Sequence, residues 1–274
     1  TAGHVQGTEA GATKRFQPGH AAAARVKAAL LAHDGLTGPA DPWFGRFGFY
    51  QTYEDDAYDT ETVFSGLGES FSVEDLSLKP YPCCRYVHTT IDAGLELRKA
   101  HEITLDDVES ATVFVNADGY TACAEPSSVR YAPETFIQLQ FNLPYALAVS
   151  LADGRPRLAH FTDDAVERAN EMRLGRIETA ATAEFDEGYA DKISPARVRV
   201  TTADGQSHEV TRIDPRGHPN NRMTEDEFRT KFVECVEFSG LGLDRDAVDQ
   251  LLTLFDDLET LESVEPIFST LEGD

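Results

Sequence analysis

Residues 79–99, KPYPCCRYVHTTIDAGLELRK, contain the most informative pattern in this chain. The apolar residues from Pro82 to about Lys99 recur at helical spacing, so we expect a helix that begins at Pro82. Proline suits the first turn of a helix, because its missing N–H would have no partner there. The N–H groups of the next three residues would then face an incoming anion with the positive end of the helix dipole.

Basic side chains surround this expected helix start. Lys79 precedes it, and Arg85 and His88 are three residues apart, so they would share one helix face. An arginine fork can bind a carboxylate through two donors, and lysine and histidine can transfer protons. The segment therefore favours a carboxylate site. A capped helix with surface cations is the alternative interpretation.

A second basic segment is ATKRFQPGHAA, residues 12–22. Lys14 and Arg15 precede an alanine-rich stretch that we expect to form a helix after Pro18 and to end at Gly35. Such a helix start would also attract an anion. An ordinary loop and cap is the alternative.

Strand and helix patterns alternate through the middle of the chain. Residues 109–117 alternate like a strand, and two alternating runs around Asp204-Gly205 predict a hairpin. Residues 134–151 are mostly apolar and predict a buried helix that is kinked near Pro144.

The C-terminal segment starts with Thr224 and Glu227 at capping-box spacing and continues through helices. The order is therefore helix, mixed α and β, then helix. We expect an α+β fold in which a smaller α+β domain, residues 67–222, is inserted into a larger all-α domain formed by residues 1–66 and 223–274.

Charge and hydropathy exclude several classes of protein. The 274 residues include 48 acidic and 24 basic side chains, a net charge of −24 that should repel nucleic acid. No apolar run reaches eighteen residues, and the first residues lack a signal-peptide pattern, so we expect a cytoplasmic protein without a membrane partner. The acidic surface suits high salt, and a cation-binding surface is the alternative.

Four cysteines, Cys83, Cys84, Cys123 and Cys235, lack the spacings of zinc or iron–sulfur ligands. We therefore expect no metal. The adjacent pair, Cys83 and Cys84, could form a disulfide only with strain, so packing near a pocket is the favoured role. A cysteine-dependent redox protein is a further alternative.

Five segments together resemble the MmgE/PrpD family. The first basic segment resembles the family's lysine–tyrosine–proline–cysteine signature, followed by its histidine and its "ID" helix. The second resembles its "TKR" stretch nearly residue for residue, and three more occur in the same order: FGFY, 47–50; FNLPYALAVSLADG, 141–154; and HPNNRMTEDEFRTKF, 218–232.

The resemblance implies a cofactor-independent enzyme that acts on small polycarboxylic acids, is a homodimer, and has its active site between an all-α and an α+β domain. The family includes 2-methylcitrate dehydratase, cis-aconitate decarboxylase and iminodisuccinate epimerase. By position it implies three catalytic residues and four substrate-binding residues: Lys14, Lys79 and His88, and Arg15, Cys84, Arg85 and Tyr120.

We expect a hydro-lyase similar to 2-methylcitrate dehydratase; an epimerase or a decarboxylase of the same family is the alternative. In the decarboxylase branch, a histidine stands where this chain has Cys84, and the first signature often has a histidine in place of Gln17. The resemblance begins near the middle of the family's usual chain. A separate chain could therefore supply the N-terminal helical half, and this chain alone would be inactive or a non-catalytic subunit.

Overall fold

The computed structural model describes residues 13–54 and 57–272, with side chains from Phe16 to Leu271. The described residues divide into two compact units, one up to Leu76 and one from Ser77 onward. No helix within these ranges is long and apolar enough to cross a bilayer. The three-segment domain assignment made from the sequence stays a prediction.

The first unit is helical and is built on one long helix, α2 (Thr13–His33). This helix starts before Pro18 and continues through it, so the prediction that it begins after the proline is wrong. The predicted end at Gly35 is confirmed: Gly35 has φ +97°, and the Leu36 N–H donates to the Leu31 carbonyl at 2.9 Å. Three short elements follow: α3 (Phe49–Tyr53), α4 (Thr60–Phe64) and η1 (Ser72–Asp75).

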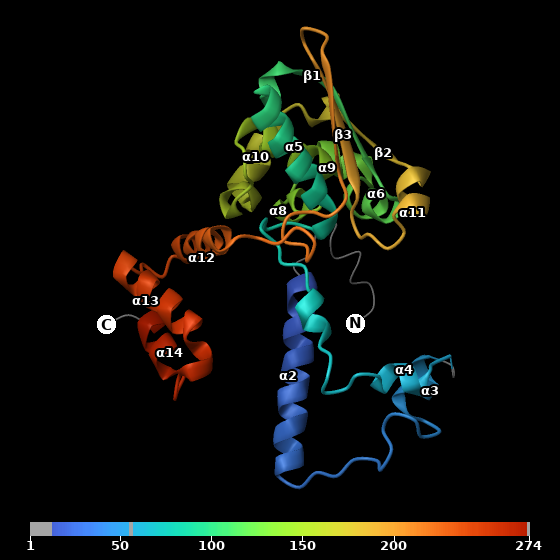
Figure 1. The fold of residues 1–274 in the computed structure, drawn as a ribbon, viewed down its shortest axis with the longest axis vertical. Coiled ribbons are helices and arrows are strands. Elements are labelled where there is room, and N and C mark those ends of the chain that lie inside the picture. Colours follow the sequence, from blue (N-terminus) through green and yellow to red (C-terminus); the bar gives the residue numbers. More distant parts are fainter. Residues whose placement is uncertain (1–12, 55–56, 273–274) are drawn as a thin grey trace. The chain divides into compact units, whose positions relative to one another are not determined.

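The second unit contains a four-stranded mixed sheet in the order β2-β1-β3-β4 (Figure 1). Strand β1 (Val108–Val115) pairs in parallel with β2 (Ile177–Ala181) and antiparallel with β3 (Ala196–Thr202). Strand β4 (Ser207–Arg212) completes the predicted hairpin. Side chains on β1 and β3 alternate between buried and exposed, so one face of the sheet is covered.

Two helices, α5 (His88–His101) and α9 (Leu143–Ala152), pack against each other and cover the buried face of the sheet (Figure 1). Gly94 permits their close approach, because a Cβ there would lie 2.8 Å from the Ser150 Cβ. The nine residues from Leu143 to Leu151 are all buried. Their apolar side chains join the core of the unit.

Two details differ from the sequence-based prediction. The apolar stretch 134–151 forms two helices, α8 (Phe136–Leu139) and α9, instead of one kinked helix. The reason is local: Asn142 caps α9 by accepting from the Tyr145 N–H at 2.9 Å, and Pro144 lies in the first turn. Strand β2 was not predicted.

Shorter helices surround this layer: η2 (Arg85–Val87), η3 (Leu105–Asp107), α6 (Ala117–Cys123), α7 (Ser127–Tyr131), η4 (Leu158–Phe161), α10 (Asp163–Glu171), η5 (Leu174–Arg176) and α11 (Ala183–Gly188). The C-terminal elements are α12 (Glu225–Ser239), α13 (Arg245–Asp256), η6 (Leu258–Thr260) and α14 (Glu265–Glu272). The predicted capping box of α12 is present. The four-stranded sheet and the helices around it confirm the predicted α+β fold.

Candidate functional site

The candidate site is the segment of residues 79–87, which precedes helix α5. Backbone hydrogen bonds fix its path. The Cys83 N–H donates to the Tyr81 carbonyl at 2.9 Å, and the Cys84 N–H donates to the Gln140 carbonyl at 2.8 Å. The first bond tightens the segment itself, and the second anchors it to the loop between α8 and α9.

The prediction that a helix begins at Pro82 is therefore wrong. The Gln140 side chain donates to the Pro82 carbonyl at 3.1 Å, and this contact helps to hold the segment in a non-helical path. Helix α5 begins only at His88, after the short turn η2. Because the N–H groups of Cys83 and Cys84 already have acceptors, they do not form the expected anion cradle.

Arg85 is held by three contacts at the start of α5. Its Nη1 lies 3.1 Å from the His88 Nδ1 and 3.1 Å from the Arg216 carbonyl oxygen, and its Nη2 donates to the Ser77 hydroxyl. Burial lowers the pKa of Arg85, yet an arginine keeps its charge at any physiological pH. None of the three partners is a carboxylate, so they orient the guanidinium without neutralising it.

His88 is fully buried beneath Arg85. Arg85 can only donate, so the His88 Nδ1 accepts and the ring proton lies on Nε2, which has no hydrogen-bond partner among the described residues. Burial, followed by the charges of Arg85 and Lys79, lowers the pKa of His88 well below its usual value. The geometry suits a neutral ring that positions Arg85. The acid or base role stays a prediction.

Lys79 is exposed at the other end of the segment. Its Nζ donates to the Cys83 carbonyl at 3.2 Å. Within the described ranges, neither Lys79 nor Arg85 forms an ion pair with a carboxylate. The two cations lie on one short segment of an acidic chain, and together they favour an anionic ligand.

A half-buried carboxylate supports this segment from helix α5. Asp92 accepts from the Tyr81 hydroxyl at 2.7 Å and from the Arg216 N–H at 2.6 Å. Burial raises the pKa of Asp92, although these hydrogen bonds act in the opposite direction. The same Arg216 residue presents its carbonyl to Arg85. Asp92 thereby fixes both the segment and the loop that orients Arg85.

The loop that carries Arg216 depends on Gly217. This glycine has φ +86°, and a Cβ there would lie 2.0 Å from the Leu78 carbonyl oxygen. The Leu78 N–H donates to the Gly217 carbonyl at 2.8 Å. The Arg216 guanidinium meanwhile binds Glu227, the capping-box residue of α12, with Nε 3.0 Å from Oε1.

Sequence reasoning missed five of these supporting residues: Ser77, Asp92, Gln140, Arg216 and Gly217. The signal for two of them was available. The Arg-Gly pair lies in the loop between the predicted hairpin and the predicted C-terminal helix, and the aspartate follows a buried isoleucine of α5. Their partners lie more than a hundred residues away in sequence, however, and no local pattern identifies such a pairing.

The remaining predicted residues lie nearby or outside the described side chains. Cys84 is half-buried and packs against the core. Tyr120 lies on α6, which packs against η2, but its hydroxyl forms no hydrogen bond with the other candidates in the described part of the chain. The side chains of Lys14 and Arg15, in the first turns of α2, lie outside the described residues.

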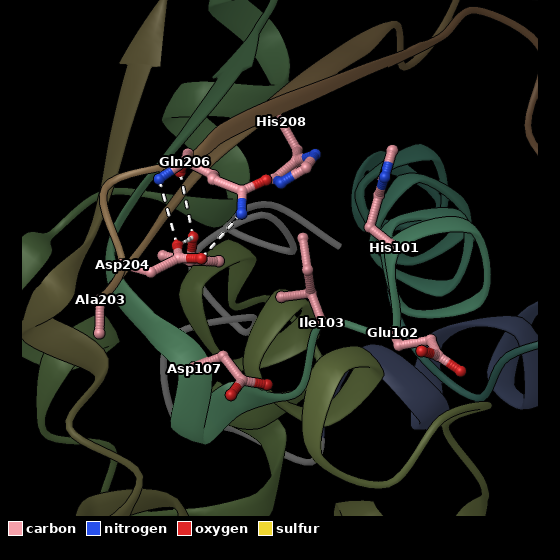
Figure 2. Close-up of a pocket in the computed structure, with 9 residues that line it drawn as sticks. His101, Glu102, Ile103, Asp107, Ala203, Asp204, Gln206 and His208 are labelled. Atoms are coloured by element: carbon pink, nitrogen blue, oxygen red, sulfur yellow. Dashed lines mark hydrogen bonds between the residues drawn. The ribbon is translucent and has the colours of Figure 1, made fainter.

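A hollow elsewhere in the unit offers different chemistry (Figure 2). It has a volume of about 500 Å³. It contains His101 and His208, whose ring centroids are 4.2 Å apart, and Asp204, which accepts from the Gln206 amide at 2.8 Å. Its lining has no lysine or arginine, so it does not suit a polycarboxylate. Among the described residues, no group of three metal-ligating side chains is arranged to hold an ion.

Fold and site together define a class: a two-layer α+β domain with two cations, neither in an ion pair among the described residues, beside the start of helix α5. Residues 81–254 match the model of the MmgE/PrpD C-terminal domain. The chain therefore belongs to the MmgE/PrpD family, a family of lyases.

Two curated relatives are cis-aconitate decarboxylases of Aspergillus terreus. The protein of strain NIH 2624 / FGSC A1156 is 27% identical over an alignment of 280 residues, and the match covers 95% of this chain and 55% of that protein. The second is 28% identical over an alignment of 264 residues, and the match covers 86% of this chain and 52% of the relative. The chain thus spans about half the length of the curated relatives it matches. These similarities support the decarboxylase alternative better than the hydro-lyase hypothesis.

Proposed function

We propose that this chain provides the carboxylate-binding part of a lyase that decarboxylates a small polycarboxylic acid similar to cis-aconitate, without a metal or an organic cofactor. The names of the two curated relatives support the reaction class. The charged segment at the start of α5 supports the substrate class, because a substrate with several carboxylates needs fixed cations in an otherwise acidic protein.

One observation carries the proposal: the Arg85 guanidinium is oriented by three neutral groups and has no carboxylate partner among the described residues. An arginine held in this way keeps its full charge and a fixed direction for its remaining donors. It can therefore bind a substrate carboxylate through two donors at little further entropic cost.

Loss of carbon dioxide leaves negative charge on the carbon next to a second carboxylate. In our proposal Lys79 and Arg85 stabilise that charge, and Lys14 neutralises another carboxylate. One of the two lysines then delivers a proton to the carbanion. His88 positions Arg85 and does not touch the substrate. Arg15, Cys84 and Tyr120 remain proposed substrate contacts.

A hydro-lyase similar to 2-methylcitrate dehydratase is the second candidate. It is favoured by Cys84, which stands where the resemblance to the decarboxylase branch would require a histidine. Dehydration needs the same cations, since it also builds negative charge beside a carboxylate. An epimerase would use the same groups, and a non-catalytic subunit would use only their binding.

Exposed apolar side chains on the C-terminal helices are the basis for two proposals about protein partners. Helices α12–α14 expose large apolar side chains, among them Phe228, Phe238, Phe255 and Phe268, which are 50%, 52%, 44% and 60% exposed. Surfaces of this kind usually pack against another protein element. We propose that an N-terminal helical half, on this or another chain, covers part of them, and that the complete enzyme is a homodimer.

The test is proton NMR in heavy water of this chain co-expressed with an N-terminal half of the family. A panel of small di- and tricarboxylic acids is added to the purified complex. Decarboxylation would yield a product with one carbon fewer that carries a solvent deuteron; dehydration would yield a new alkene signal without loss of carbon. A folded complex that turns over none of these acids would contradict an enzymatic role and favour the binding subunit.

A further inference from the structure

Two cysteines that are distant in sequence meet beside the candidate site. The Cys123 thiol is hydrogen-bonded to the side chain of Cys84. Cys123 is the last residue of α6, and Cys84 directly precedes η2, the turn against which α6 packs. A sulfur–sulfur hydrogen bond brings the two thiols close together, and the contact of α6 with η2 places their backbones in the same part of the unit.

The two thiols differ in exposure, as the members of a reactive dithiol do. Cys84 is half-buried and can meet a small oxidant, whereas Cys123 is fully buried. Burial also raises the pKa of the Cys123 thiol, so Cys84 is the thiol that reacts first. Cys83 is buried and adjacent in sequence, and a bridge between neighbouring residues is strained.

We propose that Cys84 and Cys123 form a dithiol that peroxide converts into an intramolecular disulfide. The Cys84 sulfur attacks one oxygen of hydrogen peroxide, the O–O bond breaks, and water leaves; Cys84 becomes a sulfenic acid. The Cys123 sulfur then attacks the Cys84 sulfur, the S–O bond breaks, and the hydroxide takes the Cys123 proton and leaves as water. Two thiols lose two electrons, and one peroxide becomes two waters.

The disulfide would connect α6 to the segment that orients Arg85. The backbone of Cys84 is engaged on both sides: its N–H donates to Gln140 at 2.8 Å, and its carbonyl accepts from Val87 at 3.1 Å. A covalent bond at the side chain therefore pulls on a segment that has little freedom to adjust. This part of the inference rests on the proposed function: oxidation should reduce turnover by roughly tenfold or more, as small displacements of positioning groups do.

The dithiol is tested on the purified chain by peptide mapping after treatment with hydrogen peroxide. A Cys235→Ser background removes the exposed thiol of α12. Trypsin then releases residues 47–85 and 100–130 as separate peptides, and a disulfide joins them. We expect the joined pair, lighter than the sum of the two peptides by two hydrogen atoms and separated again by dithiothreitol.

Matched variants identify the sulfur involved. Cys83→Ser should keep the joined peptides, and Cys84→Ser should lose them. The parent measurement does not depend on whether the variants fold, and circular dichroism shows whether they do. Absence of the joined pair in the parent, or its persistence in Cys84→Ser, would overturn the proposal.

Activity provides a separate measurement in the complete enzyme. Peroxide should lower turnover of the Cys235→Ser protein as the joined peptides form, and dithiothreitol should restore turnover and separate the peptides. Inhibition that appears without the joined peptides, or that dithiothreitol does not reverse, would overturn the link between the disulfide and the site. If no acid is turned over before oxidation, the proposed function fails, while peptide mapping still decides the dithiol.

Discussion

Two helices of the same compact unit show opposite degrees of burial. Helix α9 buries nine consecutive residues against α5 and the sheet, whereas no residue of α12 is buried in the described structure. The comparison separates a helix whose apolar side chains this chain buries itself from one whose apolar side chains stay exposed. The α+β layer has its own apolar core, and the C-terminal helices carry apolar side chains that stay exposed.

The largest expected difference between the two helices is the loss of stability when one apolar side chain is removed from each. Leu147→Ala removes a fully buried side chain of α9 and should lower the free energy of unfolding by about 3 kcal/mol. Phe238→Ala, on α12, removes a side chain that is 52% exposed and should change it by less than about 0.5 kcal/mol. Urea unfolding followed by circular dichroism measures both. Equal losses would mean that the C-terminal helices are packed as firmly as the sheet layer.

The sequence predicted the sheet layer well where a local pattern determined it. The hairpin around Asp204-Gly205 has a turn that needs a positive φ, and Gly205 has φ +84°. Strand β2 was missed, because its residues Ile177–Ala181 alternate weakly and pair in parallel with a distant strand. The start of α5 was misplaced because Gln140, from another element, holds the preceding residues out of the helix.

In the candidate site, too, local patterns predicted some features, and others depend on contacts between distant residues. Lys79, Arg85 and His88 share one short segment, so their association could be predicted from spacing. The contacts that orient them come from Ser77 and Arg216, and only the fold shows these partners.

The second prediction concerns the loop that joins the two regions. Gly217→Ala places a Cβ against the Leu78 carbonyl and strains a positive φ, so it should cost about 2 kcal/mol or more. Gly205→Ala is the matched control: its φ is +84°, but nothing lies within 4 Å of the new Cβ. Strain alone should then cost about 1 kcal/mol. Thermal unfolding of both variants compares the two costs, and equal values would remove the role assigned to the contact with Leu78.

The third and smallest effect is the pH dependence of the sheet layer. The pKa of His88 in the folded protein lies below its ordinary value of 6.5. Below about pH 6.5 the unfolded chain therefore binds a proton that the folded chain does not, and stability falls as the pH falls. The raised pKa of Asp92 acts in the opposite direction, since the folded state then takes up a proton more readily.

A substitution separates the two contributions. His88→Asn keeps an acceptor for Arg85 and cannot be protonated. Urea unfolding at pH 7.5 and pH 5.5 should therefore show a smaller loss of stability on acidification in His88→Asn than in the parent. A loss of the same size in both proteins would mean that His88 is not held neutral.

The central claim is that the cations of the segment before α5 bind the substrate's carboxylates. Its most direct test is the value of kcat/KM for cis-aconitate in the complete enzyme with Lys79→Ala, beside Lys99→Ala as the control. Both lysines are exposed: Lys79 precedes helix α5, and Lys99 lies in the last turn of that helix. We predict a loss of roughly 100-fold or more for Lys79→Ala and none for Lys99→Ala. Activity of Lys79→Ala within about twofold of the parent would contradict the claim.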